Sequence, residues 1–515
     1  MSVLYRNISY NLLGRTSALL LALAGVRLFF RFFGSDALGV FYFAMALSAT
    51  LRGALEMGVS STTVREIAKH FHDEPRYVER LVRTAAALYW SVFLLLALLV
   101  WRVAPWLALR WLHLESIDVA SATLLLRILA VAALLALPRG LYDSVCRGLE
   151  RMELNNRIDV AMALLQQAVA ILMMLLGAGL LPVVGWIAAA QVIWLATYLV
   201  VCGRVLSPRA LLPSFFGDVI KRNRVFGSRM FLVSSLSMVQ VQIDKLLVSK
   251  LLPVRVLGYY ATLDACALRL GLVSDAVAQA AFPRLTGLIR RGGHEAAYGQ
   301  YRLLARALCL GAVPLYCALV FAEPALFTAL FNAEVARALL VPAIFLCLGY
   351  YMNATVNILY VYSLAAGQPR FAVRFLIYEF VVCVPSTIWL VRDYGLAGAA
   401  FSWVLAHLVG YVYFVPAVSS QCLRRPAGEW FRPMGLVALL TALTYAAALE
   451  AIFLTGRRDI QALLLAYGGA TLAYGAGAYV LAGLELRDLL RAAAGGWLRR
   501  GAAARPVPSD LEARS

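Results

Sequence analysis

Apolar runs of about 20 residues follow one another along nearly the whole chain, and short polar stretches separate them. A helix of this length spans the hydrocarbon core of a bilayer, so each run predicts a membrane-spanning helix. The predicted fold class is therefore an all-α polytopic membrane protein with about 14 transmembrane helices. The spans are expected near residues 11–32, 37–59, 84–104, 120–141, 158–180, 182–203, 228–251, 256–281, 303–322, 338–364, 371–391, 395–416, 434–454 and 460–483.

A short repeat divides this series of spans into two halves. The sequence Leu-Gly-Val-Phe-Tyr at 38–42 opens the second span, and Leu-Gly-Tyr-Tyr at 257–260 opens the eighth, 219 residues later. Six spans separate the two copies, so both halves are expected to have the same orientation in the membrane. Transporters are often built from such repeats, with the substrate site between the two lobes.

Composition and charge narrow the class and predict the orientation. The chain is 62% hydrophobic with a mean hydropathy of +0.78, which excludes an ordinary soluble protein. Its net charge of +19 does not indicate a nucleic-acid partner, because the basic residues lie between the apolar runs and form no binding motif. Polar segments on the amino-terminal side hold 30 Lys and Arg, those on the other side hold 8, and 9 lie inside spans. The positive-inside rule therefore predicts that both termini are cytoplasmic. The basic segment 60–83 on that side is either an amphipathic helix on the inner leaflet or a solvated loop.

Charged residues inside the apolar runs are the main candidates for function. A charge at membrane depth is costly, so it normally faces a partner or a water-filled cavity. Arg15, Arg27 and Arg31 lie toward the ends of the first span, where they could instead reach the headgroups. Arg52 and Arg269 lie deeper in their spans and favour a polar cavity. The other charged candidates are Glu56, Arg127, Asp244, Lys245, Asp264 and Asp275.

Asp244 and Lys245 are adjacent, so on a helix their side chains diverge by about 100°. We expect that they do not pair face to face and that each needs a partner from another helix. Asp264 and Asp275 in the eighth span could pair with Lys245 or Arg269. The alternative for these acids, and for Glu56, is a cation or proton site that couples transport.

The sequence shows no set of residues that predicts catalysis or metal binding. The eight cysteines are scattered without a C-x-x-C pair, and five dispersed histidines do not suggest a metal site. His407 lies deep in an apolar run, where packing is a simpler role than proton relay. We therefore expect neither an enzyme nor a cofactor. Several bases in a membrane cavity suit an anionic ligand, and phosphate or pyrophosphate fits best because guanidinium binds it bidentately.

Several stretches in order resemble the lipid-linked oligosaccharide flippases of the Wzx type, which handle polysaccharide and O-antigen precursors. This family lies within the multidrug/oligosaccharidyl-lipid/polysaccharide exporter superfamily. The degenerate pieces are Asn11–Gly14, Leu38–Tyr42, Glu56–Ser60, Arg65–Ala68, Arg147–Arg151 and Asn155–Asn156. The more specific pieces are Gln242–Leu247, Leu257–Tyr260 and Phe282–Leu285 in and around the seventh and eighth spans. The resemblance covers about the first 300 residues, whereas the later part is similar mainly in its number of spans.

The resemblance implies two six-helix lobes around a central cavity, at residues 1–203 and 228–418. It also implies two peripheral helices at 433–483 and a cytoplasmic tail at 484–515. By the same resemblance, alternating access would move an undecaprenyl-pyrophosphate-linked glycan from the inner to the outer leaflet of the bacterial inner membrane. The implied phosphate ligands are Arg15, Arg27, Arg52, Lys245 and Arg269. The expected partners are the prenyl-pyrophosphate glycan lipid, membrane lipids and other polysaccharide assembly proteins.

Two other functions remain as alternatives. A cation-coupled multidrug exporter of the same fold would rely on Asp244, Asp264 and Asp275 rather than on the bases. However, related antiporters use an acid in the first span, and this span has none before Asp36. A membrane-bound glycan polymerase or ligase would need a large outer loop, whereas the longest one expected here is only about 105–119.

Overall fold

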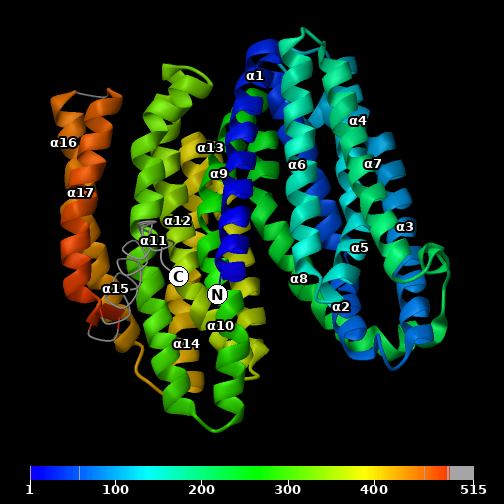
Figure 1. Cartoon of the computed structure of the whole chain (residues 1–515). Coiled ribbons are helices and arrows are strands. Elements are labelled where there is room, and N and C mark those ends of the chain that lie inside the picture. The colour runs from blue at the N-terminus through cyan, green and yellow to red at the C-terminus, as the bar shows by residue number, and fades with distance from the viewer. Residues whose placement is uncertain (1, 57, 457–458, 484–485, 488–515) are drawn as a thin grey trace, which may run out of the picture. The chain divides into compact units, whose positions relative to one another are not determined.

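The computed structural model describes residues 2–56, 58–456, 459–483 and 486–487, and Figure 1 shows the course of the chain. The side chains of residues 2–18, 225–230, 232–234 and 239 are not among those described. All elements of the described part are helices, and it has no strand, apart from one isolated bridge between His113 and Pro253. The predicted all-α class is therefore confirmed.

The helices of the first half are α1 (Ser2–Leu55), α2 (Val59–His70), α3 (Pro75–Trp106), η1 (Leu107–Trp111), α4 (Val119–Leu134), α5 (Ala136–Gly148), α6 (Met152–Leu175), α7 (Leu180–Val205) and η2 (Pro208–Leu211). The middle of the chain forms α8 (Gly217–Leu251), α9 (Val254–Leu270), α10 (Leu272–Arg290), α11 (His294–Leu330) and α12 (Ala333–Ala365). The last part forms α13 (Pro369–Val409), η3 (Gly410–Phe414), α14 (Val415–Val418), η4 (Ser419–Leu423), α15 (Gly428–Thr441), η5 (Ala442–Ala446), α16 (Ala447–Thr455) and α17 (Ile460–Leu481).

The number of membrane-spanning helices is roughly consistent with the predicted series. Eleven continuous helical stretches in the described residues are long and apolar enough to cross a bilayer. Two of them contain a sharp break at a glycine with positive φ, Gly34 (84°) in α1 and Gly395 (57°) in α13, so each supplies two spans. Glycine suits these breaks because it has no Cβ to clash at positive φ. The 35-residue helix α8 contains the predicted span 228–251, although it is not one of the eleven stretches.

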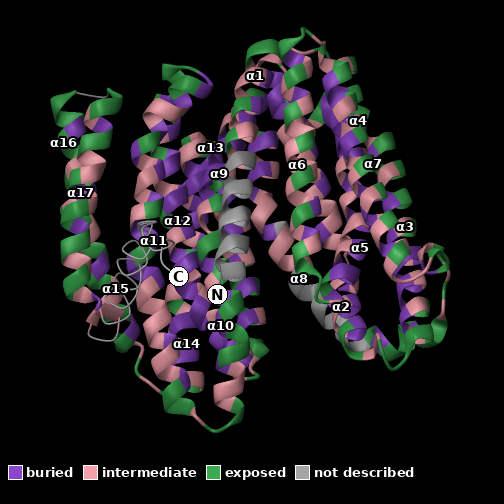
Figure 2. Ribbon diagram, in the orientation of Figure 1, coloured by how far each residue is buried: buried purple, intermediate pink, exposed green. Residues whose placement is uncertain are grey.

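The chain forms two compact units, each assembled from separate stretches. Unit 1 consists of residues 1–266, 323–349 and 373–409, and unit 2 consists of residues 267–322, 350–372 and 410–515. In unit 1, α1 packs against α4, α6 and α8, while α5 packs against α2, α3 and α7. In unit 2, α15, η5 and α16 pack against α17. Figure 2 colours the buried residues purple, and they recur along the helices of each unit.

The predicted division into lobes at 1–203 and 228–418, with helices 433–483 and a tail beyond, stays a prediction. The predicted segment 60–83 is mostly helical, as α2 and the start of α3. Its helix α2 packs on α3, α5 and α8 and buries Ile67 completely. This segment therefore forms part of the folded unit and is not a solvated loop.

Candidate functional site

At one end of unit 1, helices from the two halves of the chain pack against each other through the repeated motif. A Cβ atom on Gly39 of α1 would lie only 2.0 Å from the carbonyl oxygen of Val254, at the start of α9. A Cβ on Gly258 would lie 3.2 Å from the backbone nitrogen of Gly39. Close by, Thr262 Oγ1 donates to the Tyr42 hydroxyl at 3.1 Å. The two copies of the motif are thus in direct contact, and glycine is needed where the backbones approach.

Polar bonds fix the loops around this contact. The buried carboxylate of Asp36 accepts from the backbone N–H groups of Glu115 and Ser116, at 2.7 and 2.6 Å. The side chain of Glu115 in turn pairs with Arg255 of α9 at 2.6 Å. We call this packed end of unit 1, from Gly39 and Asp36 to Arg255 and Gly258, the interhelical seal. Asp36 therefore has a structural partner here.

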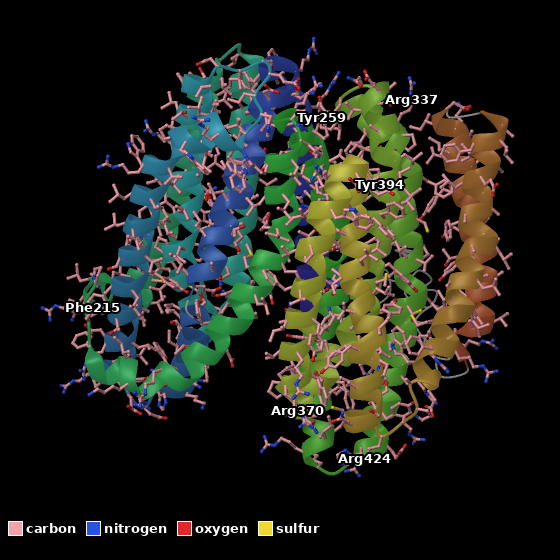
Figure 3. The ribbon with its side chains drawn as sticks, turned by 180° about the vertical axis from the view of Figure 1, so that it is seen from behind. Phe215, Tyr259, Arg337, Arg370, Tyr394 and Arg424 are labelled. Carbon is pink, nitrogen blue, oxygen red and sulfur yellow. The ribbon has the colours of Figure 1, made fainter. Side chains whose placement is uncertain are left out.

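Arg27 is also part of the packing near this end. Its Nη1 donates to the carbonyl oxygens of Leu330 and Phe331 at 3.0 and 3.2 Å. These carbonyls end helix α11, where the helix dipole favours a cation. Phe331 also packs against the ring of Tyr259, which Figure 3 labels, with centroids 4.8 Å apart. Arg27 thus holds a helix end in this structure, and its predicted role toward phosphate stays a prediction.

A cavity of about 550 Å³ lies elsewhere in unit 1, where the last turns of α1 meet α2, α3 and α5. Its polar lining consists of Arg52 from α1, Glu56 directly after that helix, Ser60 and Ser61 from α2, Tyr89 from α3, and Arg147 from α5. We call it the Arg52 cavity. Its volume falls in the range of ordinary ligand pockets.

The two arginines of the Arg52 cavity differ in their partners. Among the described residues, Arg52 makes no hydrogen bond and no ion pair within 4 Å, and Glu56, four residues later, supplies only a longer-range attraction. Arg147 is exposed and pairs with Asp143 one turn earlier in α5. A guanidinium in a cavity without a close carboxylate is a site where an anion can bind with charge-assisted hydrogen bonds.

The wall of this cavity is rigidly held. The Tyr89 hydroxyl lies 3.0 Å from Ser60 Oγ and 3.1 Å from the Ser60 backbone nitrogen, and it donates to the Glu56 carbonyl oxygen at 3.3 Å. These bonds tie the start of α2 to α3. They leave the side chains of Arg52 and Ser61 as polar groups that line the cavity.

Glu66 anchors the other end of α2. Its buried carboxylate accepts from Arg65 Nε at 2.9 Å and from the Tyr77 hydroxyl at 2.8 Å. Burial raises the pKa of Glu66, but the hydrogen bonds from Tyr77 and Arg65 together outweigh it, so the net pKa is lowered. The carboxylate therefore supports the helix that forms one wall of the Arg52 cavity.

A second acid, Asp264, lies beside the Asp244–Lys245 pair. Lys245 Nζ lies 2.9 Å from Asp264 Oδ2 in α9 and 3.3 Å from Asp244 Oδ1. The hydroxyl of Tyr260 donates to the other oxygen of Asp244 at 2.9 Å. All three charged side chains are buried. We call this group the Lys245 cluster.

The Lys245 cluster confirms one expectation and corrects another. Asp244 and Lys245 do have partners on another helix, α9, as expected. The expectation that the two do not pair with each other was wrong. The long lysine side chain turns back along α8, where Nζ also donates to the Val241 carbonyl at 3.0 Å, and this brings it within reach of Asp244.

Three further residues predicted from the sequence are Arg15, Arg269 and Asp275. The side chain of Arg15 is outside the described residues. Arg269 is exposed near the end of α9 and belongs to unit 2. Asp275 of α10 is exposed and accepts from Asn357 Nδ2 at 3.0 Å, also in unit 2. A cavity shared by Arg52, Lys245 and Arg269 therefore stays a prediction.

Two polar arrangements in unit 1 were not predicted from the sequence. Arg139 of α5 donates to Gln191 at 2.8 Å and stacks 3.9 Å from the ring centre of Trp194. The side chains of His407 and Glu379, both buried in α13, contact each other across the break at Gly395. Arg139 beside Pro138 and the lone histidine in an apolar run were visible signals. Glu379 gave none, because its partner is 28 residues away.

The comparisons with known proteins identify the family. The sequence pattern described as "Polysaccharide biosynthesis protein" matches residues 4–288, which is more than half of the chain. The chain belongs to this family. Within the family match lie α1 to α9 and most of α10, which include the interhelical seal, the Arg52 cavity and the Lys245 cluster.

One curated relative covers most of this polysaccharide biosynthesis protein. It is a Shigella flexneri protein provisionally named an O-antigen transporter, 23% identical over 408 residues. The match covers 77% of this chain and 93% of the relative.

The fold of this family member is similar to that of two solved structures. The lipid II flippase MurJ, in an inward closed conformation, matches with a TM-score of 0.71 and 14% identity over 93% of this chain and 99% of that one. An inward-facing multidrug resistance transporter of the MATE family and MOP superfamily matches with a TM-score of 0.62 and 14% identity. That match covers 79% of this chain and 95% of the other. The chain is thus a multi-pass membrane protein with the fold of these transporters.

Proposed function

We propose that this protein is a flippase that moves an undecaprenyl-pyrophosphate-linked oligosaccharide from the cytoplasmic to the outer leaflet. The observation that carries the proposal is the Arg52 cavity, because it presents a guanidinium that forms no ion pair within 4 Å among the described residues. Such a group suits a diphosphate, whose oxygens accept charge-assisted hydrogen bonds. The family supports the same substrate class. So does the Shigella flexneri relative, which is provisionally named an O-antigen transporter.

The proposed mechanism is alternating access. Arg52 lies toward the end of its span that the charge count predicts to be cytoplasmic, where a lipid headgroup of the inner leaflet would enter. The interhelical seal would close the other end while the substrate binds. In the outward-open state, the contacts of Gly39 with Val254 and of Arg255 with Glu115 would separate. Arg27, whose bonds hold a helix end near this seal, would then become available to the substrate.

The remaining parts of the proposal concern location and chemistry. We propose that the protein lies in the bacterial inner membrane with both termini cytoplasmic, as the distribution of Lys and Arg predicts. Its work would be transport without bond chemistry, so we propose no catalytic residue. Other polysaccharide assembly proteins would supply the substrate and receive the product.

The test is export in a strain that depends on this protein. The variant Arg52→Gln combined with Arg269→Gln should reduce lipid-linked glycan at the outer surface by about tenfold or more, because each lost charged hydrogen bond costs about 1.5–3 kcal/mol. The matched control replaces two exposed arginines, Arg204→Gln and Arg392→Gln, and should export normally. Membrane abundance is measured for both. Full export by the first variant at normal abundance would overturn the proposal.

The second candidate is a cation-coupled multidrug exporter. The observation that favours it is the excess of acid in the Lys245 cluster, where two carboxylates face one ammonium group. Under this alternative, Asp244→Asn would abolish drug resistance while Arg52→Gln would leave it intact. Drug-resistance profiles of a deletion strain separate the two functions, since a flippase deletion changes glycan export and not resistance to cationic drugs.

A further inference from the structure

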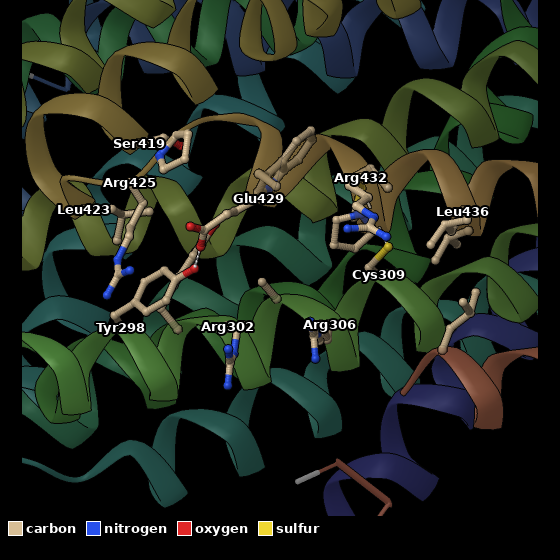
Figure 4. Close-up of a pocket in the computed structure, with 18 of the residues that line it drawn as sticks. Tyr298, Arg302, Arg306, Cys309, Ser419, Leu423, Arg425, Glu429, Arg432 and Leu436 are labelled. Carbon is tan, nitrogen blue, oxygen red and sulfur yellow. Dashed lines mark hydrogen bonds between the residues drawn. The ribbon is translucent and has the colours of Figure 1, made fainter. Parts of the chain in front are cut away.

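Unit 2 contains a second basic cavity that the proposed transport route does not use. It has a volume of about 420 Å³ and lies where α11 meets η4, the 424–427 loop and α15. Four arginines line it, Arg302 and Arg306 from α11, Arg425 from the loop, and Arg432 from α15. Figure 4 shows Arg302 and Arg306 side by side on α11, one turn apart, with Arg432 on the neighbouring segment. We call this the α11–α15 cavity.

The acids near the cavity do not balance these arginines. Glu429 is the one carboxylate among the lining residues, and it accepts a hydrogen bond from the Tyr298 hydroxyl. Glu295 lies outside the lining and pairs with Arg425 through bonds of 2.9 and 3.0 Å. Arg306 and Arg432 make no hydrogen bond or ion pair with any described residue. The cavity therefore carries an excess of positive charge at these two positions.

The remainder of the cavity is apolar, which distinguishes it from a site for a soluble ion. Its lining includes Leu310, Met434, Leu436, Val437 and Leu481, from three different helices. A soluble phosphate would leave this apolar surface without a partner. A lipid with a phosphate headgroup would cover both parts, with the phosphate at the arginines and an acyl chain along the leucines.

The position of the cavity along α11 matches the headgroup level of a bilayer. This helix has 37 residues and is therefore about 55 Å long, whereas the hydrocarbon core is about 30 Å thick. Arg302 lies eight residues from the start of the helix, about 12 Å along its axis. Arg370 and Arg424, both labelled in Figure 3, lie at the same end of unit 2 and add to its positive charge. The charge count predicts this end to be cytoplasmic.

We propose that the α11–α15 cavity binds the phosphate of an anionic phospholipid headgroup, with Arg306 and Arg432 as the principal ligands. The site is distinct from the Arg52 cavity, because the two share no lining residue. A bound lipid would join α11 to α15 through its phosphate, and would thus hold the last helices of unit 2 in place. This is a resident lipid, and it is not transported.

The experiment measures lipid binding to the purified full-length protein by native mass spectrometry and by the shift in its thermal midpoint. The probes are phosphatidylglycerol, phosphatidylethanolamine and inorganic phosphate. We expect phosphatidylglycerol to bind and stabilise the protein more than the zwitterionic lipid. The double variant Arg306→Gln/Arg432→Gln should weaken that binding by about tenfold or more.

Controls separate this site from general charge attraction. The variant Arg290→Gln/Arg291→Gln removes two exposed arginines of the same unit and should bind phosphatidylglycerol normally. If the double glutamine variant fails to fold, Arg306→Lys/Arg432→Lys keeps the charge and should retain part of the lipid preference. Equal lipid binding by the wild type and the glutamine variant would overturn the proposal. An equal stabilisation by inorganic phosphate, lost in the same variant, would also overturn the lipid as ligand and identify a soluble phosphate instead.

Discussion

Arg52 and Lys245 are both basic residues inside apolar segments of the same unit, yet their surroundings are opposite. Lys245 is enclosed by Asp244 and Asp264, with Nζ 3.3 and 2.9 Å from their oxygens. Arg52 lines a cavity of about 550 Å³ and has no ion pair within 4 Å among the described residues. Lys245 thus has its counter-charges within hydrogen-bonding distance, whereas Arg52 does not.

Bound counter-charges distinguish structural from functional charges in a membrane protein. A buried ion whose hydrogen bonds are all made within the protein contributes to the native packing, and removing one partner leaves an uncompensated charge. An ion beside a cavity keeps hydrogen-bonding capacity for a ligand. We therefore infer that Lys245 stabilises the native packing and that Arg52 is the better candidate for substrate binding.

The largest expected effect is the loss of Lys245. Lys245→Met would leave Asp244 and Asp264 buried without their cation, and breaking such a pair costs about 3–5 kcal/mol. We expect a strong fall in membrane abundance and in the thermal midpoint of the purified protein. The triple variant that adds Asp244→Asn and Asp264→Asn removes the unpaired charges and should recover most of the stability. A stable single Lys245→Met variant would place Lys245 with Arg52 as a residue free to bind substrate.

The next effect concerns the wall of the Arg52 cavity and depends on pH. The pKa of Glu66 is lowered in the folded protein, so its carboxylate contributes stability above its ordinary pKa of 4.5. That contribution is lost as the pH falls through the lowered folded value. We expect Glu66→Gln to be less stable than the wild type at pH 7, by about 1–3 kcal/mol. Thermal midpoints measured from pH 7 down to pH 3 should converge for the two proteins, whereas a constant difference would contradict the assigned role.

The fold could be predicted well because its signals are local. A run of about 20 apolar residues specifies a membrane helix without reference to any other part of the chain. The repeated Leu-Gly motif was visible as well, but its meaning was not. Only the structure shows that Gly39 and Gly258 pack against each other, because the contact joins residues 219 positions apart.

The site was harder to predict, since it depends on which charges meet. The sequence identified Arg52, Lys245 and Asp264 as intramembrane charges, but it did not reveal that Lys245 reaches both acids while Arg52 reaches none. The diverging directions of neighbouring side chains on a helix led to the wrong expectation for Asp244 and Lys245. A lysine has four flexible bonds, and its ammonium group can return to a neighbour that its Cβ points away from.

A smaller effect is expected for Arg27, which has partners but remains partly exposed. Arg27→Gln would remove two hydrogen bonds to the end of α11 and the favourable charge at a helix C-terminus. We expect a loss of about 1–2 kcal/mol in the free energy of unfolding, measured by chemical denaturation in detergent. Arg27→Lys should recover part of it, because the charge near the carbonyls is kept. No change in either variant would mean that Arg27 belongs with Arg52 among the bases without a structural role.

The smallest effect on stability is expected at Arg52, although its effect on export should be large. No described residue depends on Arg52 for a hydrogen bond, so Arg52→Gln should change the unfolding free energy by less than about 0.5 kcal/mol. Replacing it could even stabilise the protein slightly in the absence of substrate, since a partly buried guanidinium without a close counter-ion carries a desolvation cost.

The measurement is the thermal midpoint of purified Arg52→Gln with and without added inorganic pyrophosphate. We expect pyrophosphate to raise the midpoint of the wild type but not that of the variant. If pyrophosphate stabilises both proteins equally, the anion binds elsewhere and Arg52 loses its distinction from Lys245.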